Sequence, residues 1–185
     1  MAKRTIQKTR NAMPCVDPDV RRHTFGEVAT GYTPELALNE AARCIQCKNR
    51  PCIEGCPVEI DIPKFVEQMS TGDFLAAYQT LVDKNVLPAI CGRVCPQEDQ
   101  CEKLCTLGVK FEPVAIGRLE RYLADWAAEN HVQSEAETHR SPKTGHKVAI
   151  VGSGPAGLTA AADLARMGHD VTVFEALHKA GGVLV

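Results

Sequence analysis

Apolar side chains recur every three or four positions between residues 34 and 130, which is the spacing of amphipathic helices. Thr33 marks the first helix start, because threonine caps helices and is followed here by a proline and an acid, which both suit a first turn. Asp61 and Asp73 mark two further starts, and Pro113 opens a fourth helix. No stretch here alternates as a strand does, so the sequence predicts short helices with the cysteine groups in the intervening loops.

The pattern changes after residue 146. Residues 147–151 form a short β-branched run, and a glycine-rich turn leads into an alanine- and leucine-rich helix from Pro155 to Met167, which Gly168 ends. Residues 171–175 form a second β-branched run. A strand, a helix and a second strand in this order predict a β-α-β unit.

These patterns divide the chain into segments. The stretch at residues 129–146 is polar and contains serine, proline and glycine, as a linker does. We therefore expect an N-terminal arm at residues 1–32, a helical iron–sulfur domain at residues 33–130, a linker at residues 131–146 and an incomplete dinucleotide-binding domain at residues 147–185.

Composition and charge exclude several classes of function. The formal net charge of −2 gives no reason to expect nucleic acid or an anionic membrane as a partner. The apolar stretch at residues 148–165 contains glycine, proline and aspartate, which a lipid-facing helix tolerates badly. The basic residues at the N-terminus precede no apolar run, so they do not form a signal peptide. We expect a cytoplasmic protein, in which structural disulfides are rare.

Eight of the nine cysteines fall into two tight groups, each with a Cys-Pro step. The groups are Cys44-x2-Cys47-x4-Cys52-x3-Cys56-Pro57 and Cys91-x3-Cys95-Pro96-x5-Cys101-x3-Cys105. The ninth, Cys15, stands apart, and we expect it to be a spare thiol. Eight thiols are enough for two four-thiolate metal centres, whereas an odd cysteine count fits a disulfide framework poorly.

Three interpretations of the cysteine groups compete. Cysteine can be a small buried apolar residue, but eight in two groups with Cys-Pro steps make that explanation poor. Two structural zinc sites would also use four thiolates each. We favour a pair of iron–sulfur clusters, because such a cluster is held by about four thiolates and the Cys-Pro step is typical of two-cluster ferredoxins.

The Cys-Pro steps also indicate how the ligands divide. In two-cluster ferredoxins the cysteine before the proline belongs to the other cluster, so Cys56 joins the second group. We expect Cys105, at the far end of the second group, to cross back to the first. The first cluster would then be held by Cys44, Cys47, Cys52 and Cys105. The second would be held by Cys56, Cys95 and Cys101, and the spacing leaves its fourth ligand open between Cys91 and a carboxylate from elsewhere.

The turn after residue 151 has the pattern Gly152-x-Gly154-x-x-Gly157. In a dinucleotide-binding fold these glycines make the turn, admit a pyrophosphate to the backbone and the helix N-terminus, and let helix and strand pack closely. Glu175 would accept hydrogen bonds from ribose, which suits FAD or NAD better than NADP. A glycine-rich turn without a ligand is the alternative. The predicted cofactor-binding residues are Gly152, Ser153, Gly154, Pro155, Ala156, Gly157, Glu175 and Gly182.

Longer strings carry a family resemblance over nearly the whole chain. They lie at residues 31–33, 40–44, 55–63, 87–98, 113–120 and 152–158. Together they resemble the small-subunit family of NADPH-dependent glutamate synthase. The same module resembles the N-terminal part of dihydropyrimidine dehydrogenase and the large subunit of NADH-dependent reduced ferredoxin:NADP oxidoreductase.

The resemblance implies a fold class and a ligand. It implies a mainly α-helical domain with two [4Fe–4S] clusters, followed by an α/β FAD-binding domain of Rossmann type and an NADPH domain. It assigns the open fourth ligand to Glu120 and leaves Cys91 as a non-ligand. Without the resemblance, Glu120 would be interpreted as a solvated helix charge between Arg118 and Arg121.

The resemblance also implies electron transfer between NADPH, FAD, two clusters and a partner. The partner would be an FMN-containing glutamate synthase large subunit or a ferredoxin, in a hetero- or homo-oligomer. An electron-bifurcating ferredoxin:NADP oxidoreductase or a sulfide dehydrogenase would use the same module. A zinc- or cluster-stabilised helical docking module without redox activity is the alternative from another class.

The sequence departs from the family because it stops at Val185, before most of the FAD domain and the whole NADPH domain. We expect this chain alone to bind FAD weakly or not at all and to have no NADPH activity. No nucleophile or general base is visible, so no catalytic residue is predicted. His131, His139 and His146 lie in or beside the linker and are expected to be solvated.

Overall fold

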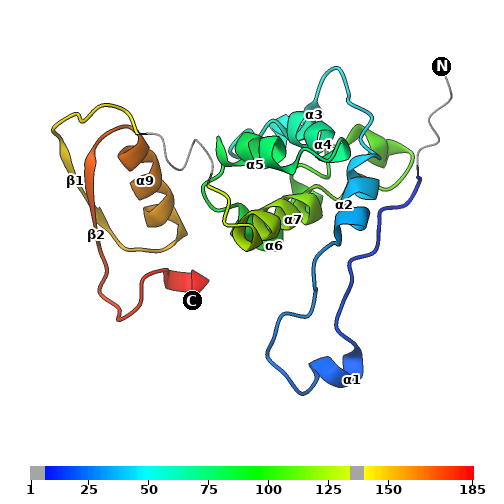
Figure 1. Cartoon of the computed structure of the whole chain (residues 1–185), viewed down its shortest axis with the longest axis horizontal. Coiled ribbons are helices and arrows are strands. Elements are labelled where there is room, and N and C mark those ends of the chain that lie inside the picture. The colour runs from blue at the N-terminus through cyan, green and yellow to red at the C-terminus, as the bar shows by residue number, and fades with distance from the viewer. Residues whose placement is uncertain (1–6, 134–139) are drawn as a thin grey trace. The chain divides into compact units, whose positions relative to one another are not determined.

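The computed structural model describes residues 7–133 and 140–185. It divides the chain into two compact units, Met1–Val132 and Gln133–Val185. The elements in chain order are α1 (Pro18–Arg21), α2 (Pro34–Ala41), α3 (Pro51–Glu54), α4 (Ile62–Ser70), α5 (Phe74–Val82), α6 (Pro88–Val94), η1 (Gln97–Asp99), η2 (Thr106–Val109), α7 (Ile116–Glu129), β1 (Lys147–Val151), α9 (Pro155–Arg166), β2 (Asp170–Phe174) and η3 (Gly182–Leu184) (Figure 1). The first unit is helical, and the second is a β-α-β unit.

Three helices of the first unit begin at the predicted capping residues. The Thr33 hydroxyl accepts from the Leu36 amide of α2, at 3.3 Å. The carboxylates of Asp61 and Asp73 accept in the same way at the starts of α4 and α5. Each cap satisfies an amide that has no partner within its own helix. The predicted starts of these helices are confirmed.

Two details of the helical prediction are wrong. The helix expected to open at Pro113 begins at Ile116, because the Ala115 amide donates to the buried Glu40 carboxylate at 3.0 Å instead of entering a helical turn. The cysteines also do not all lie in loops, since Cys52 lies in α3 and Cys91 in α6. A helix of one or two turns has too little periodicity to be found in a sequence.

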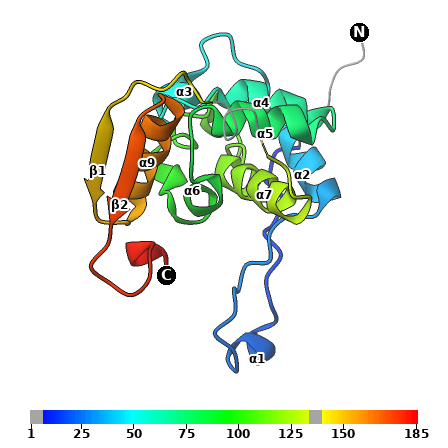
Figure 2. The same cartoon turned by 60° about the vertical axis from the view of Figure 1, so that its left-hand side comes forward.

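The core of the first unit lies between α2, α4, α5 and α7. In Figure 2, α4 and α5 lie along one side of α7, and α2 lies at its other side. The apolar side chains that fill this space are buried, among them Phe65 and Met69 from α4, Leu81 from α5, and Leu119 and Leu123 from α7. The helices that carry this core also fix the ends of the loops that bear the cysteines.

In the described residues, the N-terminal arm packs on the first unit on both sides of a long excursion. Residues 14–30 form this excursion and extend away from the helices, with α1 near the tip (Figures 1 and 2). The two sides of the excursion are joined by backbone hydrogen bonds, and Cys15 pairs with Ala29 in an isolated antiparallel bridge. Tyr32 and Arg118 fix its base, because both donate to the Asn11 carbonyl at 2.7 Å.

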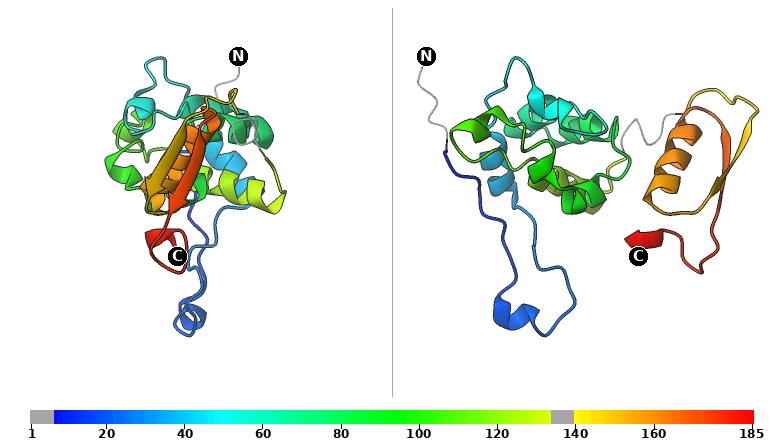
Figure 3. Two further views of the ribbon diagram at one scale, coloured as in Figure 1. Left: turned by 90° about the vertical axis from the view of Figure 1, so that its left-hand side faces the viewer. Right: turned by 180° about the vertical axis from the view of Figure 1, so that it is seen from behind.

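The second unit consists of two parallel strands and one helix. The strands run in register from Lys147 beside Asp170 to Val151 beside Phe174. Helix α9 covers one face of the two strands, which face the viewer in the left panel of Figure 3. The β-α-β unit predicted from the sequence is confirmed.

Part of the predicted linker belongs to this second unit. The Ser141 amide donates to the Arg166 carbonyl at 2.8 Å, and the Thr144 amide donates to the Gly168 carbonyl at 3.0 Å. His146 is exposed, and so is His131 at the end of the first unit. His139, also expected to be solvated, lies outside the described residues. Among the described residues, no helix has both the length and the apolar character that crossing a bilayer requires.

Candidate metal centres and dinucleotide turn

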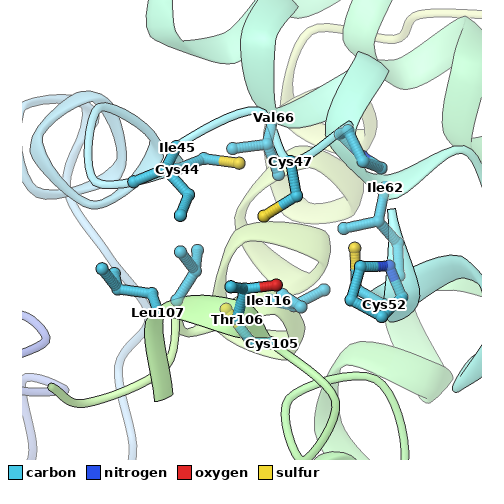
Figure 4. A pocket seen from close by; sticks show the side chains of 13 residues that line it. Cys44, Ile45, Cys47, Cys52, Ile62, Val66, Cys105, Thr106, Leu107 and Ile116 are labelled. Atoms are coloured by element: carbon cyan, nitrogen blue, oxygen red, sulfur yellow. The ribbon is translucent and has the colours of Figure 1, made fainter. Parts of the chain in front are cut away.

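Four thiols from both cysteine groups border one cavity in the first unit. Cys44 follows α2, Cys47 lies in the next loop, Cys52 lies in α3, and Cys105 precedes η2. Figure 4 shows their side chains around the same space, although Cys105 comes from the second group in the sequence. The space, including its opening to solvent, measures about 410 Å³. The rest of the wall is mainly apolar and includes Ile45, Ile62, Val66, Leu107 and Ile116.

Burial shapes the acid–base chemistry of this cavity. Burial, together with the neighbouring sulfurs of Cys44 and Cys105, raises the pKa of the Cys52 thiol to about 12. A thiol with such a pKa stays protonated at neutral pH unless a cation stabilises the thiolate. Thiolates are the form that binds metal, so this set of donors fits a positively charged metal group rather than an empty pocket.

A buried ion pair holds the chain just before Cys44. Glu40 and Arg43 are both almost fully buried, and Arg43 Nη1 donates to Glu40 Oε1 at 2.5 Å. The Arg43 guanidinium also donates to the carbonyls of Glu112 and Pro113, at 2.6 and 3.0 Å. The carboxylate of Glu40 accepts from Asn11 as well as from the loop before α7. The pair therefore ties α2, the N-terminal arm and the start of α7 together beside the first cysteine.

Sequence reasoning missed the role of Gln46. Its side-chain amide donates to Cys44 Sγ at 3.5 Å and to the Pro63 carbonyl at 2.9 Å. The backbone of Gln46 has a φ of 51°, a left-handed conformation that costs energy for a residue other than glycine. A strained residue between two cysteines is a signal of a functional loop, but strain is visible only in the structure.

The remaining cysteines gather around a carboxylate. Burial, together with the nearby groups of Cys91, Glu120 and Cys56, raises the pKa of Cys95 to about 12. Burial also raises the pKa of Cys101, with Cys56 and Glu120 again among its neighbours. The structure thus brings together the predicted second set of ligands and both candidates for its fourth member.

Glu120 is not a solvated helix charge. It is only 6% exposed and lies on the face of α7 that points inward. Its Oε1 accepts from Asn85 Nδ2 at 2.7 Å. Burial raises the pKa of Glu120 to about 7, and the hydrogen bond from Asn85 opposes this shift. The interpretation of Glu120 as a charge in water is wrong, while its role as a ligand stays a prediction.

Close contact between α6 and α7 brings Cys91 and Cys95 to Glu120. A Cβ atom at Gly92 would lie 2.5 Å from the Arg121 amide nitrogen, so only glycine fits where the two helices meet. Helix α6 ends at Val94 and is followed by the C-cap residue Cys95, whose amide donates to the Cys91 carbonyl at 3.1 Å. The backbones therefore meet within one residue of Glu120 and Cys91.

Throughout residues 7–133 and 140–185, no three cysteine, histidine, aspartate or glutamate side chains are already placed to hold one ion. A zinc site would need four sulfurs at about 2.3 Å from one point. An iron–sulfur cluster would be held by about four thiolates around a larger group.

The three glycines of the turn differ in what the fold requires of them. Gly152 has a φ of 95°, which favours glycine, and a Cβ atom at Gly157 would overlap the Gly152 carbonyl oxygen. Gly154 caps α9 with a φ of −69°, and a Cβ atom there would meet nothing within 4 Å. Neither packing nor backbone conformation explains Gly154. A ligand that must approach the backbone at the start of α9 would explain it.

Glu175 closes this turn from the end of β2. Its Oε2 accepts from both the amide and the hydroxyl of Ser153, at 2.9 and 2.5 Å, and its Oε1 accepts from the Leu177 amide at 2.9 Å. These hydrogen bonds, first of all that from the Ser153 hydroxyl, lower the pKa of Glu175 to about 2. The carboxylate keeps further lone pairs for a ribose hydroxyl. The sequence predicted for Glu175 only the role of accepting hydrogen bonds from ribose.

The other predicted cofactor-binding residues lie around the same turn. Pro155 and Ala156 form the first turn of α9. A Cβ atom at Gly182 would lie 2.9 Å from Gly154 Cα, so η3 begins beside the helix start. The Gly181 amide donates to Ser153 Oγ at 3.0 Å, which links the two glycine-rich segments.

A helical unit with two gathered cysteine sets, joined to a dinucleotide-type turn, defines an iron–sulfur protein with a nucleotide-binding unit. Comparison with known families agrees. The family model for dihydropyrimidine dehydrogenase domain II, 4Fe-4S cluster, matches residues 21–132, and a model for an NAD(P)-binding Rossmann-like domain matches residues 150–184. The chain belongs to the dihydropyrimidine dehydrogenase domain II family.

Individual relatives include two enzyme subunits and a putative oxidoreductase. The subunit PreT of NAD-dependent dihydropyrimidine dehydrogenase from Salmonella typhimurium is 39% identical over 164 residues, 89% of this chain and 39% of the relative. The glutamate synthase [NADPH] small chain from Escherichia coli is 38% identical over 165 residues, 89% of this chain and 34% of the relative. The putative oxidoreductase AegA from the same bacterium is 36% identical over 167 residues, 90% of this chain and 25% of the relative. The chain thus spans at most about two fifths of the length of these relatives.

Proposed function

We propose that this chain is the electron-transfer region of an oxidoreductase that takes electrons from NAD(P)H through FAD and delivers them to a partner protein through two [4Fe–4S] clusters. One observation carries the proposal: Cys105, from the second cysteine group, lines the same cavity as Cys44, Cys47 and Cys52. A crossed ligand set of this kind is typical of proteins that hold two clusters near each other. The clusters, when bound, supply one-electron chemistry, and the protein supplies position and tuning.

The eight proposed ligands follow from the two gathered sets. Cys44, Cys47, Cys52 and Cys105 would hold the first cluster, inside an apolar wall that limits water. Cys56, Cys95, Cys101 and Glu120 would hold the second, with an oxygen in place of the fourth sulfur. Raised thiol pKa values support ligation in both sets, because such thiols need a cation to become thiolates.

The second unit would hold the pyrophosphate of FAD at the start of α9. Gly154 leaves the approach open, the N-terminus of α9 carries the positive end of its dipole, and Glu175 would accept from ribose. Two strands and one helix bury neither face of the sheet well. We therefore expect this chain alone to retain little FAD after gel filtration and to show no NADPH oxidation.

We assign the whole protein to the glutamate synthase type, in which the partner is an FMN-containing large subunit or a ferredoxin in the cytoplasm. The match to the PreT subunit favours a second candidate, a subunit of a dihydropyrimidine dehydrogenase. The module is the same in both, so the partner decides between them. Chemically reduced protein should be reoxidised rapidly by one of these partners and not by the other.

The first test is chemical analysis of anaerobically purified protein. We expect about eight iron and eight acid-labile sulfide per chain and no zinc, as two [4Fe–4S] clusters require. Cys44→Ser should lower both contents by about half, whereas Cys15→Ser, which changes an exposed cysteine outside both sets, should change neither. About two zinc and no sulfide would contradict the proposal and support the docking module.

A further inference from the structure

Asn85 is a buried amide that touches both candidates for the fourth ligand of the second cluster. It lies between α5 and α6 and is only 5% exposed. Its Nδ2 donates to Glu120 Oε1 at 2.7 Å, and its Oδ1 is 3.6 Å from Cys91 Sγ, which donates to it. No motif in the sequence had marked this residue.

The backbone fixes which way this amide points. The Leu87 amide donates to Asn85 Oδ1 at 3.0 Å, just before α6 begins. Since a backbone N–H can only donate, the oxygen must face Leu87 and the side-chain nitrogen must face Glu120. The orientation of the Asn85 amide therefore follows from the backbone N–H of Leu87. It gives Glu120 a hydrogen-bond donor and Cys91 an acceptor.

This arrangement treats the two candidate ligands, Glu120 and Cys91, differently. The bond from Asn85 engages Glu120 Oε1, so Oε2 would be the oxygen left to bind a metal. The same residue's carbonyl oxygen holds the Cys91 sulfur on the side of the amide.

We propose that Asn85 is a positioning residue that presents Glu120 to the second cluster and keeps Cys91 out of its ligand set. The inference rests on the proposed function, because it needs a cluster at this site. It adds a residue that contacts a ligand without being one. It also gives a physical reason why a glutamate, and not the nearby cysteine, would complete the site.

The test replaces the side-chain amide of Asn85 with a group that fills the same space. Asn85→Asp has the same shape and keeps the acceptor for Leu87, but it loses the donor to Glu120. We expect iron to fall from about eight to about seven per chain, with the EPR signal of an oxidised three-iron cluster, while the first cluster keeps its spectrum. Asn85→Ser, whose hydroxyl can still accept from the Leu87 amide, should behave in the same way if the aspartate variant folds poorly.

A double-mutant cycle separates positioning from general loss of structure. If Asn85 acts through Glu120, Asn85→Asp combined with Glu120→Ala should lose no more iron than Glu120→Ala alone. Additive loss, or equal loss from both clusters, would show a merely structural role. Alkylation of Cys91 gives a second readout, because Cys91 should stay reactive in the loaded wild-type protein.

A matched control and the wild type keep the two proposals apart. Asn130→Asp changes an exposed amide at the end of α7, which donates to the Trp126 carbonyl, and it should keep all iron. Wild-type protein with two clusters and an Asn85→Asp variant with the same iron content and spectrum would overturn the role of Asn85 alone. Wild-type protein without a second cluster would overturn both proposals.

Discussion

The two units of this chain are stabilised in different ways. The first unit buries a continuous apolar core, and all the fully buried large apolar side chains that the structure describes lie in it. In the second unit, α9 buries no residue completely, and Val151 at the end of β1 is 89% exposed. The unit that contains the candidate metal sites is thus held by packing. The unit with the dinucleotide turn is held mainly by backbone pairing and local hydrogen bonds.

The difference teaches where each kind of site gets its rigidity. Metal ligands that come from several loops keep their positions only if the helices that end those loops are fixed by a core. A glycine-rich turn between a strand and a helix needs only its own backbone and a few contacts, such as that between Ser153 and Glu175. Native-state hydrogen exchange, measured for separate peptides, gives the stability of each unit separately and can test this comparison.

The largest effect should come from Arg43→Ala. The substitution leaves Glu40 buried without its partner, which costs about 3–5 kcal/mol in comparable cases. Amides of α2 and α7 should lose protection of this size, while those of α9 keep theirs. Arg22→Ala removes an exposed ion pair with Asp19 and should cost at most about 1 kcal/mol. An equal fall in the hydrogen-exchange protection of α2 in Arg43→Ala and in Arg22→Ala would contradict a structural role for the buried pair of Glu40 and Arg43.

Matched leucines compare the two units directly. Leu119→Ala in α7 creates a cavity in the core and should lower the stability of the first unit by about 2–5 kcal/mol. Leu164→Ala in α9 changes a half-buried side chain and should cost about 1 kcal/mol or less. Hydrogen exchange of α7 and α9 measures both. Equal losses would mean that the second unit has a core of its own.

Matched glycines separate packing from ligand approach. Gly92→Ala forces α6 away from α7 and should cost about 1–3 kcal/mol in the first unit, as overpacking does. Gly154→Ala adds a methyl group in open space and should leave stability within about 0.5 kcal/mol. It should instead weaken FAD binding in the full-length protein. A stability loss from Gly154→Ala as large as that from Gly92→Ala would remove the argument that a ligand explains Gly154.

The smallest effect concerns a single carboxylate. Ser153→Ala removes the hydroxyl that lowers the pKa of Glu175, so that pKa should rise from about 2 towards its ordinary 4.5. A depressed pKa in the folded state adds stability above the unfolded value and loses it as the pH falls towards 2. The variant should therefore show a weaker pH dependence between pH 4.5 and 2. Carbon-13 NMR of the Glu175 carboxylate measures the shift, and an unchanged titration would show that the backbone amides alone cause it.

Much of the candidate site could be predicted from local pattern. The two cysteine groups, the Cys-Pro steps and the glycine turn are short-range features, and the predicted helix caps at Thr33, Asp61 and Asp73 lie where expected. The start of α7 was misplaced because Ala115 bonds with Glu40, seventy-five positions earlier. Asn85 and Gln46 were missed for the same reason, since Asn85 bonds with Glu120 and Gln46 bonds with the Pro63 carbonyl, and no spacing rule connects these residues.

By itself, the sequence determined the helical and β-α-β segments, the two cysteine groups and the chemistry that they favour, because residues close in the chain decide periodicity, capping and turn geometry. The sequence also predicted that Cys105 joins the first set, and the structure places it in the same cavity. Only the tertiary structure decided that Glu120 is buried and that Asn85 donates a hydrogen bond to it. Those facts depend on how α6 and α7 meet at Gly92 and on a core assembled from distant helices. Burial and contact between distant residues are properties of packing, which local spacing does not specify.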